Sequence, residues 1–194
     1  MSQKKKNTGL FFGSFNPVHT GHVMIANYMV EFGGMDEVWF IVSPQNPFKT
    51  KDELLPQEHR LKMTQIAVKD FENISVSDIE FAMTQPSYTI NTLNSLSENY
   101  PDREFHILMG TDNVINVHRW KNADTILKNY PLLVYPRNGY PANPDKMPTG
   151  VTITHAPIID ISSTMIREWL TAGHDVRAFM PAGVYDYIKT HNLL

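Results

Sequence analysis

The sequence contains no cysteine, and this absence removes several kinds of chemistry. Disulfide bonds, thiolate nucleophiles and cysteine-ligated zinc all depend on that side chain. A chain without cysteine is compatible with a reducing compartment. We therefore expect a cytoplasmic protein whose chemistry is carried by other residue types.

Long apolar runs and an excess of basic charge are missing as well. No stretch approaches the roughly 20 apolar residues that a membrane-spanning helix needs, so we expect no membrane association. The cluster Lys4-Lys5-Lys6 leads directly into a polar turn and a short strand, which is unlike a signal peptide. The net charge of −3 and the pI near 6.2 argue against a nucleic acid as the main partner. The composition leaves a homo-oligomer open.

Short apolar segments alternate with helical segments along all 194 residues. Strands are predicted at residues 9–15, 37–42, 74–76, 103–109, 132–135 and 151–154. Helices are predicted at residues 20–32, 56–70, 88–99, 164–172 and 181–189, and a further helix opens at 110–113, capped by Asp112 or Asn113. The Pro-, Gly- and Asn-rich segment 136–148 is predicted to be an exposed loop. The alternation predicts an α/β fold, a Rossmann-like open, mainly parallel sheet with helices on both faces, in a single domain covering residues 1–194.

The first motif with chemical content follows the first predicted strand. Residues 13–22 read Gly-Ser-Phe-Asn-Pro-Val-His-Thr-Gly-His, so His19 and His22 are three residues apart at the start of a helix and share a face. The amino end of a helix favours phosphate, and both imidazoles can donate hydrogen bonds to it, more strongly when protonated. Gly13 allows a tight turn, and Gly21 is expected to leave space for an adenine or ribose. The alternative, a helix cap with two surface histidines, is disfavoured by the strand, glycine turn and proline around the pair.

A second motif lies near the end of the chain, where residues 161–167 read Ile-Ser-Ser-Thr-Met-Ile-Arg. Three hydroxyls precede a helix, and one of them is predicted to be its N-cap. Arg167 lies one turn into that helix, and its side chain is expected to project back toward the amino end. Taken alone, this pattern is better explained as a capped helix with a surface arginine. Its occurrence together with the first motif favours a shared anion site.

Together the two motifs resemble the signature of the nucleotidylyltransferase superfamily that carries an HxGH motif. Three further pieces are similar to bacterial nicotinate-nucleotide adenylyltransferases: residues 87–93 (Ser-Tyr-Thr-Ile-Asn-Thr-Leu), Gly110-Thr111-Asp112 and Trp120-Lys121. The resemblance covers nearly the whole chain. It implies an enzyme that transfers the adenylyl group of ATP to nicotinate mononucleotide, giving nicotinate adenine dinucleotide and pyrophosphate. Nicotinamide mononucleotide and phosphopantetheine are the alternative acceptors, because enzymes acting on them share the two end motifs.

The resemblance also implies roles for individual residues. The catalytic cations would be His19, His22, Lys49 and Arg167. The ATP-binding residues would be Gly13, Ser14, Phe15, Gly110, Asp112, Ile161, Ser162, Ser163 and Thr164. The nicotinate nucleotide would be bound by Ser87, Tyr88 and Thr89 at a helix start and by stacking on Trp120. Mg²⁺ would be carried mainly by ATP oxygens, so no metal site made of protein side chains is expected.

Some positions depart from the family pattern. Asn16 and Asn91 stand where the family often has aspartate, and Phe48 replaces the usual histidine of the loop that holds Lys49. Among the histidines that match no motif, His106, His118, His155, His174 and His191 are interpreted as structural or solvated. A synthetase fragment with an HxGH-like motif is disfavoured by the short chain and by the lack of a Lys-Met-Ser-Lys-Ser-like loop. A non-catalytic nucleotide-binding module would have lost its cations, which this chain keeps.

Overall fold

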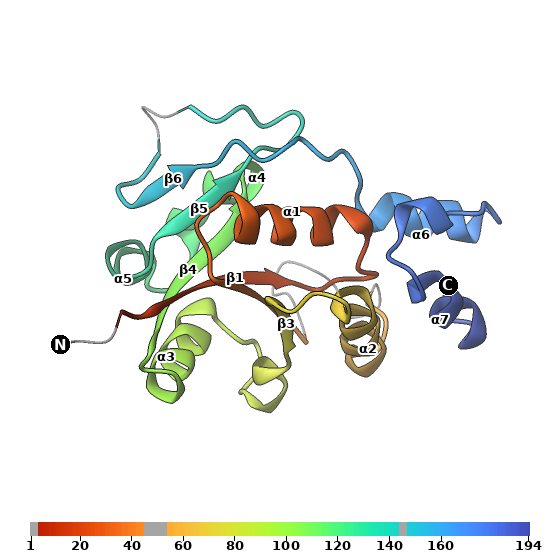
Figure 1. Ribbon diagram of the computed structural model, residues 1–194, viewed down its shortest axis with the longest axis horizontal. Helices are drawn as coiled ribbons and strands as arrows, with labels where there is room; N and C mark the ends of the chain where they lie inside the picture. The colour runs from red at the N-terminus through yellow and green to blue at the C-terminus, as the bar shows by residue number, and fades with distance from the viewer. Residues whose placement is uncertain (1–3, 45–53, 144–146) are drawn as a thin grey trace.

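A parallel sheet forms the centre of the computed structural model, which describes residues 4–44, 54–143 and 147–194. Within these ranges the sheet has six strands: β1 (Lys6–Gly13), β2 (Glu37–Val42), β3 (Ile74–Ser77), β4 (Arg103–Gly110), β5 (Leu132–Tyr135) and β6 (Val151–Ile153). Their order is β3-β2-β1-β4-β5-β6, and every neighbouring pair is parallel. Figure 1 shows this sheet with helices above and below it. The predicted Rossmann-like α/β class is confirmed.

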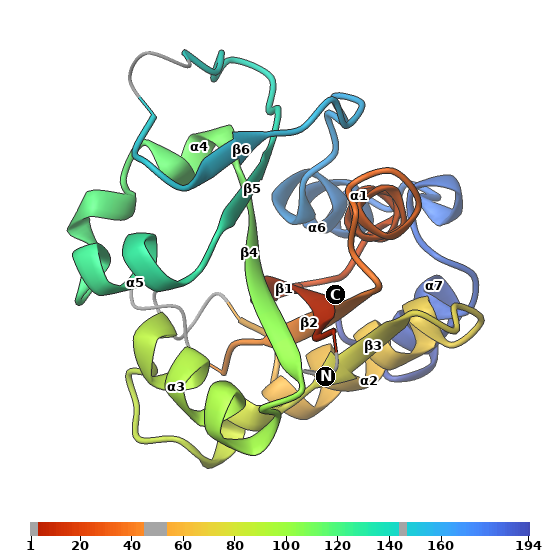
Figure 2. The same ribbon diagram turned by 60° about the vertical axis from the view of Figure 1, so that its left-hand side comes forward.

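Helices cover both faces of the sheet, as Figure 2 shows. One face packs against α1 (Thr20–Glu31), α2 (Gln57–Val68), α6 (Ser163–Thr171) and α7 (Val184–Thr190). The other packs against α3 (Thr89–Asn99), α4 (Thr111–Val114) and α5 (Ala123–Asn129). Central strands are therefore apolar on both sides: in β1, Leu10 joins the α3 side and Phe11 the α1 side. Within the described ranges, none of these helices combines the length and the apolar character needed to cross a membrane.

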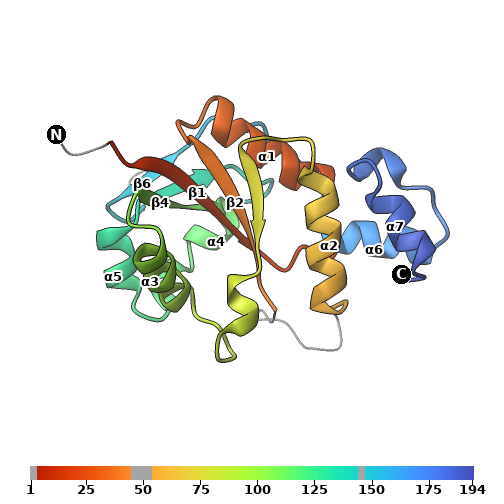
Figure 3. The ribbon, with the colours of Figure 1, turned by 60° about the horizontal axis from the view of Figure 1, so that its bottom comes forward.

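The chain ends beside its own second helix, as Figure 3 shows for α7 and α2. His59 Nδ1 of α2 lies 2.9 Å from the Tyr187 hydroxyl of α7, which joins the two helices by a hydrogen bond. Val184 and Ile188 of α7 are fully buried in the core on this face. The predicted start of this helix at residue 181 was wrong, because Gly183 adopts a left-handed conformation (φ 82°) that separates α7 from the residues before it.

Two other predicted elements differ from the structure. The first strand was expected at 9–15 but runs from Lys6 to Gly13. Its polar start is held by Glu37 of β2, whose carboxylate accepts hydrogen bonds from Lys6 Nζ and Thr8 Oγ1, both at 2.8 Å. The caps predicted for α4 were also wrong: Gly110 is the N-cap, and Asp112 lies within the helix.

The order of the strands creates a crevice at one edge of the sheet. From β1 the chain moves outward through β2 and β3, then crosses to β4 on the opposite side of β1. Helices that leave the carboxyl ends of β1 and β4 therefore diverge to opposite faces, and open α/β sheets bind ligands at such a switch point. Both predicted motifs that follow these strands, at residues 13–22 and 110–112, meet there.

Candidate functional site

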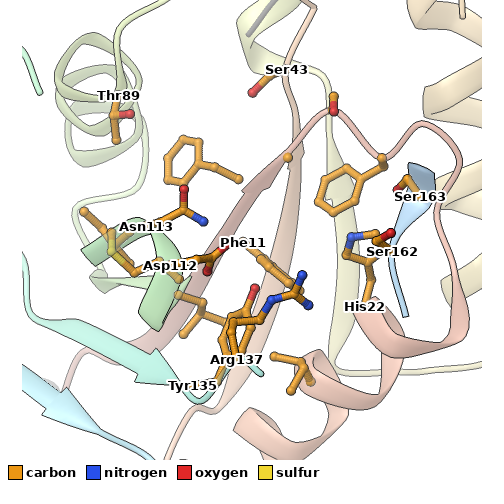
Figure 4. A pocket seen from close by; sticks show the side chains of 18 of the residues that line it. Phe11, His22, Ser43, Thr89, Asp112, Asn113, Tyr135, Arg137, Ser162 and Ser163 are labelled. Carbon is orange, nitrogen blue, oxygen red and sulfur yellow. The ribbon is translucent and has the colours of Figure 1, made fainter. Parts of the chain in front are cut away.

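A cavity of about 660 Å³ opens at the carboxyl ends of β1 and β4 (Figure 4). Most of the predicted site residues line it: Gly13, Ser14, Phe15, His19, His22, Ser87, Tyr88, Thr89, Asp112, Trp120, Ile161, Ser162, Ser163 and Thr164. Gly110 and Arg167 lie next to lining residues but are not part of the lining. Lys49 falls outside the residues that the structure describes. In Figure 4, Thr89 lies on the opposite side of the cavity from His22, Ser162 and Ser163.

The turn after β1 depends on Gly13 and on the ring of Phe15. Phe15 has a left-handed backbone (φ 45°), is almost fully buried, and packs 5.0 Å from the Phe40 ring, centroid to centroid. A Cβ atom added to Gly13 would lie 2.7 Å from the Phe15 ring. Glycine is therefore required so that the phenylalanine can fold under the turn. Phe15, predicted to bind ATP, contributes mainly to the core beneath the site.

The two histidines of the first motif form a stacked pair. His19 is the N-cap residue of α1, and the centroids of the His19 and His22 rings are 3.7 Å apart. The His19 backbone N–H donates to Nδ1 of His22 at 3.2 Å. Since Nδ1 accepts this bond, a neutral His22 carries its proton on Nε2. The pair is thus oriented by the helix start, and Nε2 of His22 is a hydrogen-bond donor.

His19 is the more buried member of the pair, with 4% of its surface exposed. Burial and, to a smaller extent, the charge of Arg137 lower its pKa to about 4, so the imidazole is neutral near pH 7. Gly21 lines the cavity, and an added Cβ would lie 2.9 Å from Ile159 Cγ2 and 3.0 Å from His19 Nδ1. Gly21 therefore allows His19 and Ile159 to pack against the helix start.

The second motif is joined to the first by two hydrogen bonds, and its own helix start is capped. Ser162 is the N-cap of α6 and accepts from the Met165 N–H at 3.2 Å, which confirms a hydroxyl cap. Ser163 Oγ donates to the Pro17 carbonyl at 2.9 Å. Arg167 Nη1 donates to the Asn16 carbonyl at 2.7 Å. Arg167 is not part of the cavity lining, but this hydrogen bond fixes the turn that carries the histidines.

Arg60 is a buried cation that the sequence reasoning missed. Only 1% of its surface is exposed, and its guanidinium donates to four backbone carbonyls, at 2.7 to 2.9 Å. Two of these carbonyls belong to Ser14 and Ser43, which follow β1 and β2 and line the cavity. Burial lowers the pKa of Arg60 to about 10, which leaves it charged at neutral pH. No sequence motif indicates this residue, because its partners are main-chain atoms.

Arg137 was also missed, although a signal for it existed. It lines the cavity two residues after the end of β5, and its backbone N–H donates to Thr111 Oγ1 at 2.9 Å. The segment 136–148 was expected to be exposed, but this hydrogen bond makes its start half-buried. The rule that ligands bind at the carboxyl ends of parallel strands points to this position.

Glu80 is a third missed residue and supports the start of α3. Its buried carboxylate accepts from Ser87 Oγ at 3.0 Å and from Thr92 Oγ1 at 2.8 Å. Burial raises the pKa of Glu80, although the hydroxyls that donate to it act in the opposite direction. Because Ser87 and Thr92 flank Tyr88 and Thr89, Glu80 fixes this part of the cavity wall.

Asp112 presents one buried carboxylate oxygen, Oδ1, that has no hydrogen-bond partner among the described residues. A Cβ on Gly110 would collide with this oxygen and lie 2.8 Å from Arg137 Cγ, so glycine is needed there. In the part of the chain that is described, no group of three or more His, Asp or Glu side chains is arranged to hold a metal ion. The buried Asp112 Oδ1 is an acceptor that suits the hydroxyl group of a ligand.

The family comparison covers most of the chain. A family model described as cytidylyltransferase-like matches residues 10–169. A Bacteroides fragilis protein named "probable nicotinate-nucleotide adenylyltransferase" is 47% identical over 184 residues, which are 95% of this chain and 92% of that protein. A Bacteroides thetaiotaomicron protein of the same name is 44% identical over 187 residues, covering 96% and 93%.

Solved structures share the fold. Plasmodium falciparum nicotinic acid mononucleotide adenylyltransferase complexed with NaAD aligns with a TM-score of 0.81 at 20% identity, covering 97% of each chain. The same protein complexed with APC aligns with a TM-score of 0.79 at 21% identity, covering 97% of this chain and 96% of that one. At these identities the similarity shows a common architecture.

Proposed function

Because the chain belongs to the cytidylyltransferase-like family and, within it, to the nicotinate-nucleotide adenylyltransferases, we propose that it transfers the adenylyl group of ATP to nicotinate mononucleotide. The products are nicotinate adenine dinucleotide and pyrophosphate. The observation that carries the proposal is the stacked His19–His22 pair, which lines one cavity together with the start of α6 and the start of α3. A cytoplasmic location is part of the same proposal.

The triphosphate of ATP would lie between the starts of α1 and α6. Both helices direct the positive end of a helix dipole there. His22 would donate from Nε2, and Ser163 and Thr164 would line the same side. Arg137 adds a permanent cation, which suits the negative charge that a triphosphate brings.

The reaction needs no covalent intermediate with the protein. An oxygen of the mononucleotide phosphate attacks the α-phosphorus of ATP, and the bond from that phosphorus to the pyrophosphate oxygen breaks. Negative charge accumulates on the departing pyrophosphate. His19 and His22 would stabilise that charge by hydrogen bonds, and holding both phosphates in line would lower the barrier further.

The acceptor would occupy the part of the cavity beside α3. Thr89 is the first residue of α3, and the positive end of a helix dipole favours an anionic group there. Trp120 lines the same cavity and offers an aromatic face on which a pyridine ring can stack. Asp112 Oδ1, buried without a partner among the described residues, suits a ribose hydroxyl of the adenosine part.

The divalent metal would be Mg²⁺, bound by ATP oxygens and water. Mg²⁺ bound to phosphates needs few protein ligands, because the phosphate oxygens and water fill most of its coordination sphere. When bound, the ion would neutralise phosphate charge. Lys49, which follows β2 in the sequence, would add a cation. Arg167 would act through the Asn16 carbonyl by fixing the turn that carries the histidines.

The direct test is to mix the protein with ATP, Mg²⁺ and nicotinate mononucleotide and to measure released pyrophosphate. Parallel reactions with nicotinamide mononucleotide and phosphopantetheine identify the preferred acceptor. We expect the nicotinate nucleotide to give the highest kcat/KM. Absence of product with it, together with turnover of another acceptor, would reject the proposal.

Replacing His22 tests the role of the histidine pair. We expect His22→Ala to lower kcat at least 100-fold, because one donor to the leaving group is lost. His174→Ala, which removes an exposed histidine far from the cavity lining, should retain wild-type kcat. His22→Gln serves as a second variant if the alanine form is unstable, and thermal melting checks that each protein is folded. A kcat near wild type in a folded His22 variant would remove the proposed role.

A further inference from the structure

Lys121 is a cation of the cavity wall that has no role in the proposed reaction. It follows Trp120, after the short helix at Val117–Arg119, and it lines the cavity together with Tyr88 and Thr89. Its Nζ atom lies 4.3 Å from the centroid of the Tyr88 ring. This cation–π contact joins the segment after Trp120 to the N-cap residue of α3.

In the part of the chain that is described, no acidic side chain forms an ion pair with this lysine. The carboxylates that line the described cavity are Glu80 and Asp112. Both oxygens of Glu80 already accept hydrogen bonds from Ser87 and Thr92. Lys121 and the start of α3 therefore present two positive groups to the same space.

The Tyr88 ring also limits how freely the lysine moves. An exposed lysine normally loses side-chain entropy when it binds an anion. A cation–π contact that keeps Nζ over a ring of the cavity wall reduces that loss, because the side chain is partly ordered before the ligand arrives. N–H groups of the ammonium that point away from the Tyr88 ring can still donate hydrogen bonds to a ligand.

We propose that Lys121 is a specificity-determining residue, whose ammonium binds the carboxylate on the pyridine ring of the acceptor and so favours the acid over the amide. This inference rests on the proposed function. A carboxylate accepts a hydrogen bond from Nζ in which both groups are ionised. A neutral carboxamide oxygen accepts a weaker hydrogen bond from the same ammonium. Arg119 also lines the cavity, so removal of Lys121 should weaken the preference without abolishing it.

A purely structural role would give a different result. If Lys121 only held Tyr88 and the start of α3 in place, its loss would impair the acid and the amide to the same extent. The ratio of kcat/KM for the two acceptors therefore separates recognition from packing. The side chain is exposed, so its replacement should leave the fold intact.

The experiment compares nicotinate and nicotinamide mononucleotides in wild type, Lys121→Met, Lys121→Arg and the control Lys128→Met. Lys128 is an exposed lysine of α5 outside the cavity lining. We expect Lys121→Met to lower kcat/KM for the acid about 10-fold to 100-fold, mainly through KM, and to change the value for the amide less than about threefold. Lys121→Arg should keep most of the preference, and Lys128→Met should match wild type. Where the amide turns over too slowly, its inhibition constant against the acid replaces its KM.

The outcomes separate a failure of the role of Lys121 from a failure of the proposed adenylyl transfer. An active wild type whose acid-to-amide ratio is unchanged in Lys121→Met would overturn the role of Lys121 alone. A wild type that releases no pyrophosphate with the nicotinate nucleotide would overturn the proposed function and this inference with it. If Lys121→Met melts early, Lys121→Gln provides a second neutral side chain for the same ratio.

Discussion

At the scale of single residues, His19 and His22 have the same side chain and lie three residues apart on the first turn of α1, yet their surroundings differ. His19 is buried beside Ile159, while His22 is only half-buried and has its Nδ1 occupied by a backbone N–H. From the sequence, both rings are predicted to bind phosphate more strongly when protonated. Burial makes His19 a neutral donor instead, so its hydrogen bond depends on the tautomer rather than on charge.

The pKa of His19 predicts a pH dependence of stability. In the unfolded chain this imidazole titrates near 6.5, and in the folded protein near 4. Between these pH values the unfolded state binds more protons, so the free energy of unfolding falls as the pH is lowered from 6.5 to 4. The decrease from this group amounts to about 3 kcal/mol at most.

Urea denaturation at a series of pH values measures this dependence. We expect wild type to lose stability more steeply than His19→Gln between pH 6.5 and 4, since the variant lacks the titrating ring. If the free energy of unfolding changes with pH to the same extent in the two proteins, His19 keeps an ordinary pKa.

At the scale of elements, Arg60 connects the segments that follow β1 and β2 to the start of α2. Replacement by methionine would preserve much of the buried volume but leave the Ser14 and Ser43 carbonyls without their donor. We expect Arg60→Met to lower the free energy of unfolding by about 2–4 kcal/mol, because buried acceptors without partners are costly. Arg60→Lys should recover part of the loss.

Chemical denaturation checks the Arg60 prediction, with Lys62→Met as the control. Lys62 is an exposed residue of the same helix, and its replacement should change stability by less than about 0.5 kcal/mol. We also expect KM for ATP to rise in Arg60→Lys, because Ser14 lines the cavity. If Arg60→Met and Lys62→Met are equally stable, the hydrogen bonds of Arg60 to the segments after β1 and β2 do not stabilise the fold.

At the scale of the whole molecule, the cavity lies between helices that leave β1 and β4 and the N-terminal end of α6. A ligand bound there contacts segments that belong to both halves of the sheet. ATP at 100 times its Kd should therefore raise the free energy of unfolding by about 2.7 kcal/mol. For a chain of this size the corresponding increase in Tm is about 5–10 °C.

Thermal melting with increasing ATP and Mg²⁺ tests this expectation. His22→Ala should need a higher ATP concentration for the same increase, whereas His174→Ala should follow wild type. A Tm that does not respond to millimolar ATP would contradict binding at the switch point.

Features that depend on neighbours along the chain could be predicted from the amino-acid order alone. Alternating apolar segments and helices predicted the parallel sheet, and the bounds of β2 and β5 were those of the structure. The spacing of His19 and His22 and the hydroxyls before α6 indicated two helix starts suited to phosphate. These inferences succeed because helix periodicity and capping are local properties.

Contacts between residues that are distant in the sequence depend on the fold and could not be predicted in this way. Arg60 reaches Ser14, Arg167 reaches Asn16 and Arg137 affects His19 because the strand order brings the ends of separate strands to one edge. Their contacts are to main-chain carbonyls or act through charge, and neither leaves a pattern in the sequence. Burial, which converts His19 to a neutral donor, is likewise a property of packing around the folded site.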